Sequence, residues 1–183
     1  MLLYKSKLLG YLEYRMPALY HATDTVLAPL DRLQDRLLQA VGCSETEALL
    51  NWNLAPLATR RDLAMLGLVH RTVLGEGPQH FRRFFRRQRQ TRSSGAWTRL
   101  AARRHTLQLE EVDYPNCPGL LRRSALGLVK LYNLLPEDTV AEVTVAGFQR
   151  KLQDLVKARA AAGCDDWALT LSPRVPLWKH ALR

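Results

Sequence analysis

The chain has 183 residues, 47% of them hydrophobic, which is enough for one globular domain with a buried core. Its formal net charge is +10, and arginine supplies 21 of the 27 basic side chains. The planar guanidinium group of arginine can donate two parallel hydrogen bonds to phosphate oxygens. The excess of arginine therefore favours nucleic acid as a partner, ahead of an acidic protein or a membrane surface. No uncharged run reaches the ~20 residues of a membrane span, and the sequence predicts no transmembrane segment.

The cysteines and the N-terminus bear on the compartment. Cys43, Cys117 and Cys164 are odd in number and lack CxxC spacing, which predicts free thiols in a reducing, intracellular environment. Nucleus and cytoplasm both remain open. The apolar run before Lys5 and Lys7 is too short for a signal peptide, and the chain is expected to enter a helix directly, as a piece of something longer.

Residues 1–86 are predicted to form a helical bundle. Spaced leucines predict a first helix from Leu2 to about Tyr20. A kink or break is expected near Arg15–Met16, because Pro17 lacks a backbone donor and clashes one turn back.

The second helix has the clearest apolar stripe, with a 4-3-4-4 spacing that predicts its buried face. The stripe consists of Val26, Leu30, Leu33, Leu37 and Val41. Gly42 is expected to close this helix in the left-handed conformation. Ser44 and Glu47 then form the pattern of a capping box, which predicts a short third helix.

A central helix is predicted from Leu57 to about Gly75, after an elbow at residues 53–56. Its apolar residues point in nearly every direction, which is typical of a helix in the middle of a bundle. One strip differs, and it consists of Arg60, Ala64, Gly67 and Arg71. Its small residues would let another backbone come close, either a second helix or a nucleic-acid strand held by the two guanidinium groups. His70 is expected to be partly exposed.

A basic region follows the turn at Gly75–Pro78. Three phenylalanines between positions 81 and 85 are expected on one face, and Arg82, Arg83, Arg86 and Arg87 on the other. From residue 77 to residue 109 the chain has no Asp or Glu and nine arginines. Like charges at this density repel, so residues 87–119 are predicted to be a flexible basic loop and turn, in which residues 107–109 could be extended.

Helices are predicted again over residues 120–171, followed by a tail at 172–183. The first of these helices runs from about Leu121 to Leu134 and is halted by Pro136. Thr144 caps a long helix that ends at Gly163, with a stripe of Phe148, Leu152 and Leu155. A short segment follows around residues 167–171. The predicted class is all-α, a multi-helix bundle interrupted by a flexible arginine-rich loop with little or no β-structure.

No residue pattern indicates catalysis, and neither a metal nor a cofactor is predicted. The histidines have no i, i+4 partner suited to a metal, and Gly75–Pro78 lacks the Lys-Ser/Thr of a phosphate loop. Asp165 and Asp166 match the paired aspartates of polymerases only superficially. A polymerase site needs a strand hairpin and a third carboxylate. The pair is instead expected to cap the short helix at Trp167.

Several phrases in order resemble one protein family. These phrases occupy, in order, residues 3–7 and 13–15, residues 30–34, residues 54–57 and 60–67, residues 131–136, and residues 148–152. This order resembles the region after the catalytic palm in reverse transcriptases of non-LTR (LINE-type) retrotransposons. The similarity spans roughly Tyr4 to Leu155. In that family a helical thumb precedes a basic, helical C-terminal part.

The resemblance implies a thumb-like holder of the template–primer backbone, with a palm domain supplied elsewhere and no polymerase activity of this chain alone. A Cys/His knuckle found in many relatives is absent. The residues expected to contact RNA or DNA backbone, without reading sequence, are Lys5, Lys7, Arg32, Arg36, Arg60, Arg61, Arg71, Arg82, Arg83, Arg86 and Arg87. The alternative is a helical protein-interaction module that binds an acidic partner through its arginines.

Overall fold

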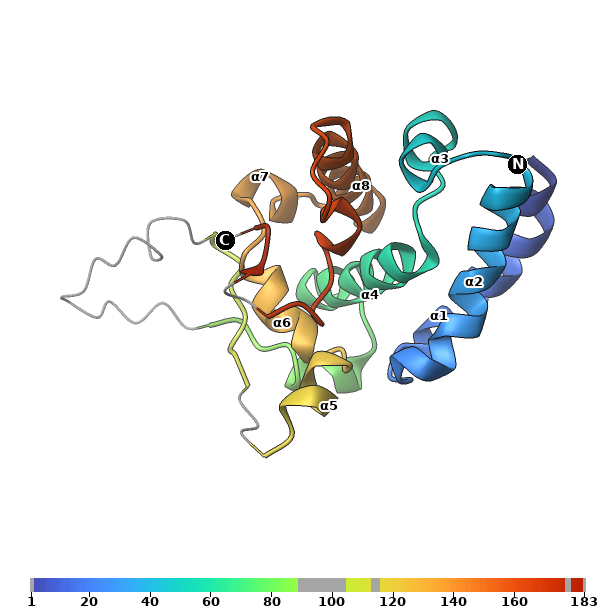
Figure 1. Ribbon diagram of the computed structural model, residues 1–183. Coiled ribbons are helices and arrows are strands. Elements are labelled where there is room, and N and C mark those ends of the chain that lie inside the picture. Colours follow the sequence, from blue (N-terminus) through green and yellow to red (C-terminus); the bar gives the residue numbers. More distant parts are fainter. Residues whose placement is uncertain (1, 89–104, 113–115, 177–178, 183) are drawn as a thin grey trace.

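The computed structural model describes residues 2–88, 105–112, 116–176 and 179–182. The predicted all-α class is confirmed: these ranges form helices and no sheet, with one isolated antiparallel bridge between Arg87 and Leu109. Figure 1 shows α4 in the middle of the fold, between the N-terminal helices and the C-terminal ones. None of the described helices is long and apolar enough to cross a membrane.

The N-terminal helix begins with a π-helical segment, η1 (Tyr4–Leu9), and continues as α1 (Gly10–Leu19). Of the kink or break expected near Arg15–Met16, a break is not observed, since α1 includes Pro17 and continues to Leu19. A proline removes one backbone hydrogen bond, and here the helix ends only two residues later.

The predicted buried face of α2 (Asp24–Ala40) is only partly right, because Leu30 and Leu37 are half-buried but the other three stripe residues are exposed. Val26, Leu33 and Val41 are 59%, 49% and 51% exposed, whereas the buried residues of α2 are Leu27, Gln34 and Leu38. Polar contacts fix this orientation. The Gln34 amide donates to the Ala55 carbonyl at 3.0 Å and accepts from the Tyr4 hydroxyl at 3.3 Å. Because leucines lie on both sides of α2, either face could be buried, and these hydrogen bonds determine which face is.

The predicted start of α3 (Glu45–Trp52) is confirmed in detail. The Glu47 amide donates to the Ser44 hydroxyl at 3.2 Å, and the Ser44 amide donates to the Glu47 carboxylate at 2.9 Å. Gly42 has the expected left-handed conformation, with φ of 64°. Asn53 ends α3 in the same region, with φ of 51°, and turns the chain into α4 (Leu57–Val73).

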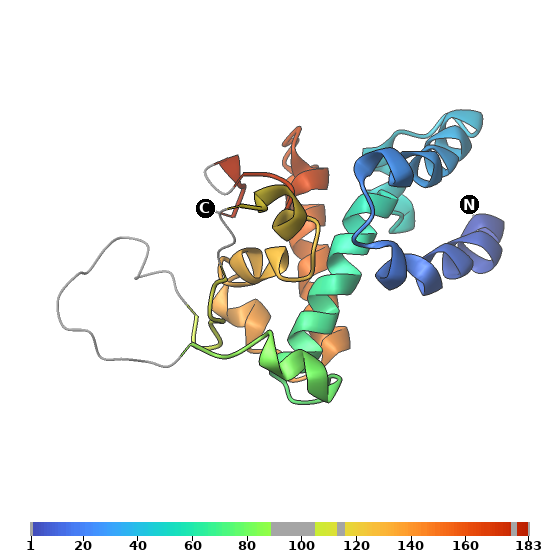
Figure 2. The ribbon, with the colours of Figure 1, turned by 90° about the horizontal axis from the view of Figure 1, so that it is seen from below.

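Helices α4 and α8 (Val145–Ala161) pack along one another and share one core. Thr144 caps α8 as predicted, by accepting from the Gly147 amide. The buried face of α8 includes Phe148 and Leu152 as expected, but Val156 is buried where Leu155 was expected. Figure 2 shows the two helices crossing at the centre of the molecule.

Most of the loop predicted within segment 87–119 lies outside the described residues, and the described part includes residues 107–109, which were expected to be extended. Leu109 is buried in the same core as α4 and α8. The Gln88 amide donates to the Gln108 carbonyl, and the Glu110 amide donates to the Arg86 carbonyl. These pairs hold residues 105–112 against the helices, because an apolar side chain and backbone partners offset the cost of ordering. Residues 89–104 and 113–115 lie outside the described part.

The C-terminal half contains shorter helices than expected. The helix predicted over 121–134 is divided into α5 (Pro118–Arg122) and α6 (Gly127–Tyr132). A Cβ at Gly127 would lie 2.5 Å from the Leu121 carbonyl oxygen, a close approach that only glycine permits. A further helix, α7 (Glu137–Val140), follows Pro136.

The expected short segment near the C-terminus is the 3-10 helix η4 (Trp167–Leu169). Residues beyond it are packed and do not form a free tail in their described part. Ser172 and His180 are buried. Arg174 pairs with Asp24 and donates to the Tyr20 and Ala22 carbonyls at 3.4 Å, which fastens this segment to the turn before α2.

Candidate nucleic-acid interface and the cavity beside Arg60

Two of the predicted phosphate ligands already hold carboxylates of the chain. Arg60 forms an ion pair with Glu13 of α1, and its Nη1 donates to the Asn53 carbonyl at 3.5 Å. Arg61 is only 6% exposed and forms a two-point contact with Asp31 of α2, with distances of 2.6 and 2.8 Å. A bidentate pair of this kind satisfies the guanidinium fork, so Arg61 cannot also reach a phosphate.

The strip of small residues on α4 is divided between two surroundings. Gly67 is buried beneath α8, where an added Cβ would lie 2.5 Å from the Gln149 amide nitrogen. Of the two alternatives for this strip, a second helix accounts for Gly67. Ala64 lines a cavity, and Arg71 is exposed near the end of α4. Arg60 and Arg71 therefore do not form one continuous phosphate-binding face.

Arg82 and Arg87 complete the C-terminal end of α4. Arg82, in the 3-10 helix η2 (Gln79–Arg83), donates to the Gly75 carbonyl, and Arg87 Nη2 donates to the Val73 carbonyl at 3.0 Å. The last carbonyls of a helix have no partner inside the helix and carry partial negative charge, so the Arg87 guanidinium stabilises the end of α4, whereas the Gly75 carbonyl that Arg82 contacts lies in the turn beyond it. Both arginines have a role within the fold.

Arg71, Arg83 and Arg86, which we call the α4-end arginines, are exposed. None of the three forms an ion pair with a residue in the described ranges. The Arg83 guanidinium lies 4.7 Å above the Phe84 ring, and Arg83 and Arg86 line a shallow hollow that also contains Glu110. Cation–π stacking holds a guanidinium in place while leaving its N–H donors outward.

The remaining predicted contacts lie on the N-terminal helices, away from the end of α4 (Figure 2). Lys5 donates to the Trp52 carbonyl at 2.8 Å, and Arg32 donates to the Ala28 carbonyl of its own helix at 3.2 Å. Lys7 and Arg36 are exposed. The predicted basic residues thus fall into four sets: the α4-end arginines, the residues on the N-terminal helices, Arg60 and Arg61 in internal ion pairs, and Arg82 and Arg87 bonded to backbone carbonyls.

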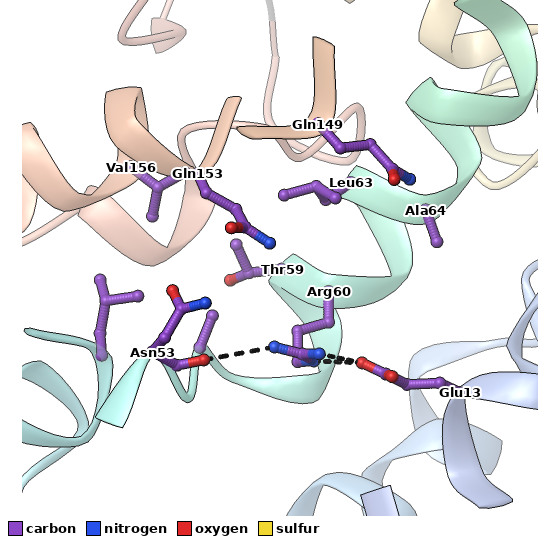
Figure 3. A pocket seen from close by; sticks show the side chains of 11 residues that line it. Glu13, Asn53, Thr59, Arg60, Leu63, Ala64, Gln149, Gln153 and Val156 are labelled. Atoms are coloured by element: carbon purple, nitrogen blue, oxygen red, sulfur yellow. Dashed lines mark hydrogen bonds and ion pairs between the residues drawn. The ribbon is translucent and has the colours of Figure 1, made fainter. Parts of the chain in front are cut away.

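A cavity of about 240 Å³ lies where α1, the elbow after α3, α4 and α8 meet. Figure 3 shows Arg60 beside it, held by Glu13, with Asn53 and Gln153 near Thr59 and with Gln149 nearer Leu63 and Ala64. No pattern in the sequence indicates this site. Gln149 and Gln153 are spaced i, i+4 on α8, but only the packing of α8 on α4 shows that both line this cavity.

His70 is fully buried, so the expected partial exposure is wrong. Its ring nitrogens lie 2.9 Å from the Tyr132 hydroxyl and 2.9 Å from the Glu142 carbonyl, and the ring stacks on Phe148 with centroids 4.0 Å apart. Burial lowers the pKa of His70. Partners for both nitrogens make this burial tolerable, and they are supplied by residues distant in sequence.

Asp62 is a second buried polar group. It accepts from the Tyr20 hydroxyl at 3.1 Å, and burial raises its pKa to about 7. Neither the His70 group nor the Asp62 group opens onto the cavity beside Arg60. Both serve the packing of α4.

The paired aspartates do not act as the expected cap. Asp166 occupies the position before η4 without a side-chain capping bond, and instead pairs with Arg159 at 2.6 Å. The described residues contain no group of three or more His, Cys, Asp or Glu side chains that could hold a metal ion.

No protein-family model, curated protein or solved structure matches this chain. None of these comparisons links it to a reverse transcriptase, and that resemblance rests on the sequence phrases alone. What the fold defines by itself is the class: an all-α protein built around α4 and α8, with a strongly basic surface.

Proposed function

We propose that the protein binds the backbone of RNA or DNA without catalysing a reaction on it, and that the α4-end arginines make the central contacts. The observation that carries this proposal is that Arg71, Arg83 and Arg86 are exposed and have no carboxylate partner among the described residues. The positive charge at the end of α4 is thus left for an external anion.

The sequence adds to this charge. Five more arginines lie between positions 89 and 104, with no Asp or Glu among them. Contacts to phosphates fix position and register but carry no sequence information. Exposed arginines that are not held by a buried polar network are therefore expected to bind without base specificity.

The resemblance to the post-palm region of LINE-type reverse transcriptases extends the proposal. In this view the chain is a retrotransposon-derived, thumb-like fragment that holds template–primer backbone for a palm supplied elsewhere. An all-α fold with basic exposed residues is compatible with such a holder, and Arg60 and Arg61 are better regarded as structural.

A filter-binding titration over a range of salt concentrations tests the proposal. The full chain is titrated with labelled duplex DNA, duplex RNA and single-stranded RNA of equal length. Each neutralised phosphate contributes about 0.9 for duplex DNA, or 0.7 for a single strand, to the slope of log affinity against log salt. A slope of several units supports backbone binding. Absence of binding, or affinity that does not respond to salt, contradicts it.

A specific observation favours the alternative, a protein-interaction module for an acidic partner. Val26 and Leu33 of α2, and Val41 directly after it, are exposed apolar residues of the stripe predicted from the sequence. Tyr14 of α1 is also exposed. Exposed apolar side chains in a row are typical of protein interfaces. Under this alternative the arginines would steer an acidic protein onto that stripe, and nucleic-acid affinity would be weak at physiological salt.

A further inference from the structure

The cavity beside Arg60 is lined by both apolar and polar side chains. Leu49, Leu63 and Val156 form part of the lining, and the small side chains of Ala55 and Ala64 leave the space open. Its volume of about 240 Å³ is below the roughly 300–1,000 Å³ of sites for drug-sized ligands. A single small ring system is the size of ligand that fits.

Three carboxamides line the cavity, those of Asn53 and Gln153 near Thr59 and that of Gln149 nearer Leu63 and Ala64 (Figure 3). None of these side-chain amides forms a hydrogen bond with a described residue, whereas the neighbouring Thr59 hydroxyl donates to the Ala168 carbonyl at 2.8 Å. Each free carboxamide offers two N–H donors and one carbonyl acceptor. The site therefore has neutral donors and acceptors side by side, at the edge of an apolar space.

The lining of the cavity carries little net charge. Arg60 is the basic residue of the lining, and Glu13 already pairs with it. An isolated phosphate or carboxylate would have to displace Glu13 from this pair. A neutral, planar ligand would leave the pair intact, with its faces against apolar side chains and its edge against the carboxamides.

We propose that this cavity binds a nucleobase. Asn and Gln form paired hydrogen bonds with base edges, and unpaired bases are the ones accessible for such contacts. Leu63 and Val156 would lie against the ring faces, while Gln153 and Asn53 would meet the edge. Rotation of each amide exchanges donor and acceptor, so the chemistry selects nucleobases as a class and does not single out one base. This binding does not depend on the α4-end arginines.

Free nucleosides test the inference because they carry no phosphate. Adenosine, guanosine, cytidine and uridine are titrated into the full chain by calorimetry, at low and at high salt. We expect saturable binding of at least one nucleoside with a dissociation constant that changes less than about twofold with salt, since no counterion is released. An unpaired oligonucleotide should compete with that nucleoside, which extends the finding to bases within a strand.

The variants separate the cavity from the rest of the surface. Asn53→Gly keeps the left-handed backbone and removes one carboxamide, and Gln153→Leu removes another, so each should weaken binding about tenfold, the value of one hydrogen bond. Ala64→Leu fills the cavity and should abolish binding. Gln39→Leu, at an exposed position of α2, is the matched control and should bind as the parent does.

The melting temperature of each variant is measured beside its titration, and binding is judged only from variants that are as stable as the parent. Several outcomes overturn the inference: no nucleoside binds at millimolar concentration, ribose alone competes equally, or Ala64→Leu binds as well as the parent. Loss of salt-dependent strand binding with nucleoside binding retained would instead contradict the proposed backbone function alone.

Discussion

Arg61 of α4 and Asp31 of α2 form a bidentate ion pair at 2.6 and 2.8 Å. The guanidinium is buried, while the Asp31 side chain is 32% exposed. Together with the Gln34 hydrogen bonds, this pair fixes the face that α2 turns toward the rest of the fold, and it explains why Arg61 is unavailable to a phosphate.

The first prediction follows from this pair. Asp31→Ala leaves the buried Arg61 guanidinium without its carboxylate, and breaking a buried pair in this way typically costs about 3–5 kcal/mol. We expect about 3 kcal/mol from chemical denaturation, since the exposed side of Asp31 is partly screened by solvent. Asp35→Ala, one turn further along α2, is the control and should change the free energy of unfolding by less than about 0.5 kcal/mol. Equal effects of both substitutions would contradict a structural role for the pair.

The second prediction concerns the two faces of α2. Leu38→Ala should lower the free energy of unfolding by about 2–5 kcal/mol, because Leu38 is buried. Leu33→Ala, on the exposed stripe, should lower it by less than about 1 kcal/mol. Urea denaturation of both variants measures the difference. A large loss at Leu33 with a small one at Leu38 would show that the predicted stripe is the buried face after all.

The third prediction is a pH dependence caused by Asp62. Burial raises its pKa to about 7, whereas the same carboxyl group in an unfolded chain has a value near 3.8. Between these values the folded protein holds a proton that the unfolded chain releases. The contribution of Asp62 to stability is therefore complete below about pH 4 and is lost as the pH rises through about 7.

Buried histidines act in the opposite direction. Burial lowers the pKa of His70, His105 and His180, so the unfolded chain takes up protons first as the pH falls below about 6.5, and stability declines. The Asp62→Asn substitution removes the opposing pH dependence of Asp62 and leaves that of the histidines unchanged. The variant should lose more stability between pH 7 and pH 5 than the parent does, measured by denaturation at both values. The exposed Asp165→Asn change is the control, and identical pH profiles for Asp62→Asn and the parent would refute the role of Asp62.

The fourth prediction separates two arginines that the sequence places on one strip. Arg60→Gln should leave strand affinity within about twofold of the parent, because Glu13 already occupies its guanidinium. Arg71→Gln should weaken affinity in low salt, because Arg71 is exposed and has no ion-pair partner among the described residues. Filter binding with thermal melts measures both. A greater loss of affinity for a stable Arg60→Gln variant would restore Arg60 as a phosphate ligand.

Local signals in the sequence predicted the features that need only neighbouring residues. The Ser44–Glu47 capping box, the Gly42 turn and the Thr144 cap all depend on bonds within about four residues. The position of α4 at the centre followed from its apolar residues on every side. These are the parts of the fold for which the chemistry is complete within a short segment.

Features that depend on distant partners could not be read in the same way. Burial of His70 requires the Tyr132 hydroxyl and the Glu142 carbonyl, and the orientation of α2 requires Gln34 to meet Ala55. The number of arginines predicted a basic surface. Only the contacts between different helices show which arginines are already engaged in ion pairs or hydrogen bonds within the fold. The cavity depends on the same kind of information, because it forms between four separate elements.

The most direct test of backbone binding at the end of α4 compares two triple variants of equal net charge. One variant changes Arg71, Arg83 and Arg86 to Gln, and the other changes Lys7, Arg32 and Arg36 to Gln. The salt dependence of binding to duplex DNA is measured for both and for the parent. We expect the first variant to lower the log–log slope by about 2–3, which corresponds to three lost phosphate contacts, and the second to change it by less than about 0.5. Equal changes in the two slopes, or an unchanged slope in the first variant, would contradict the assignment of the interface to the α4-end arginines.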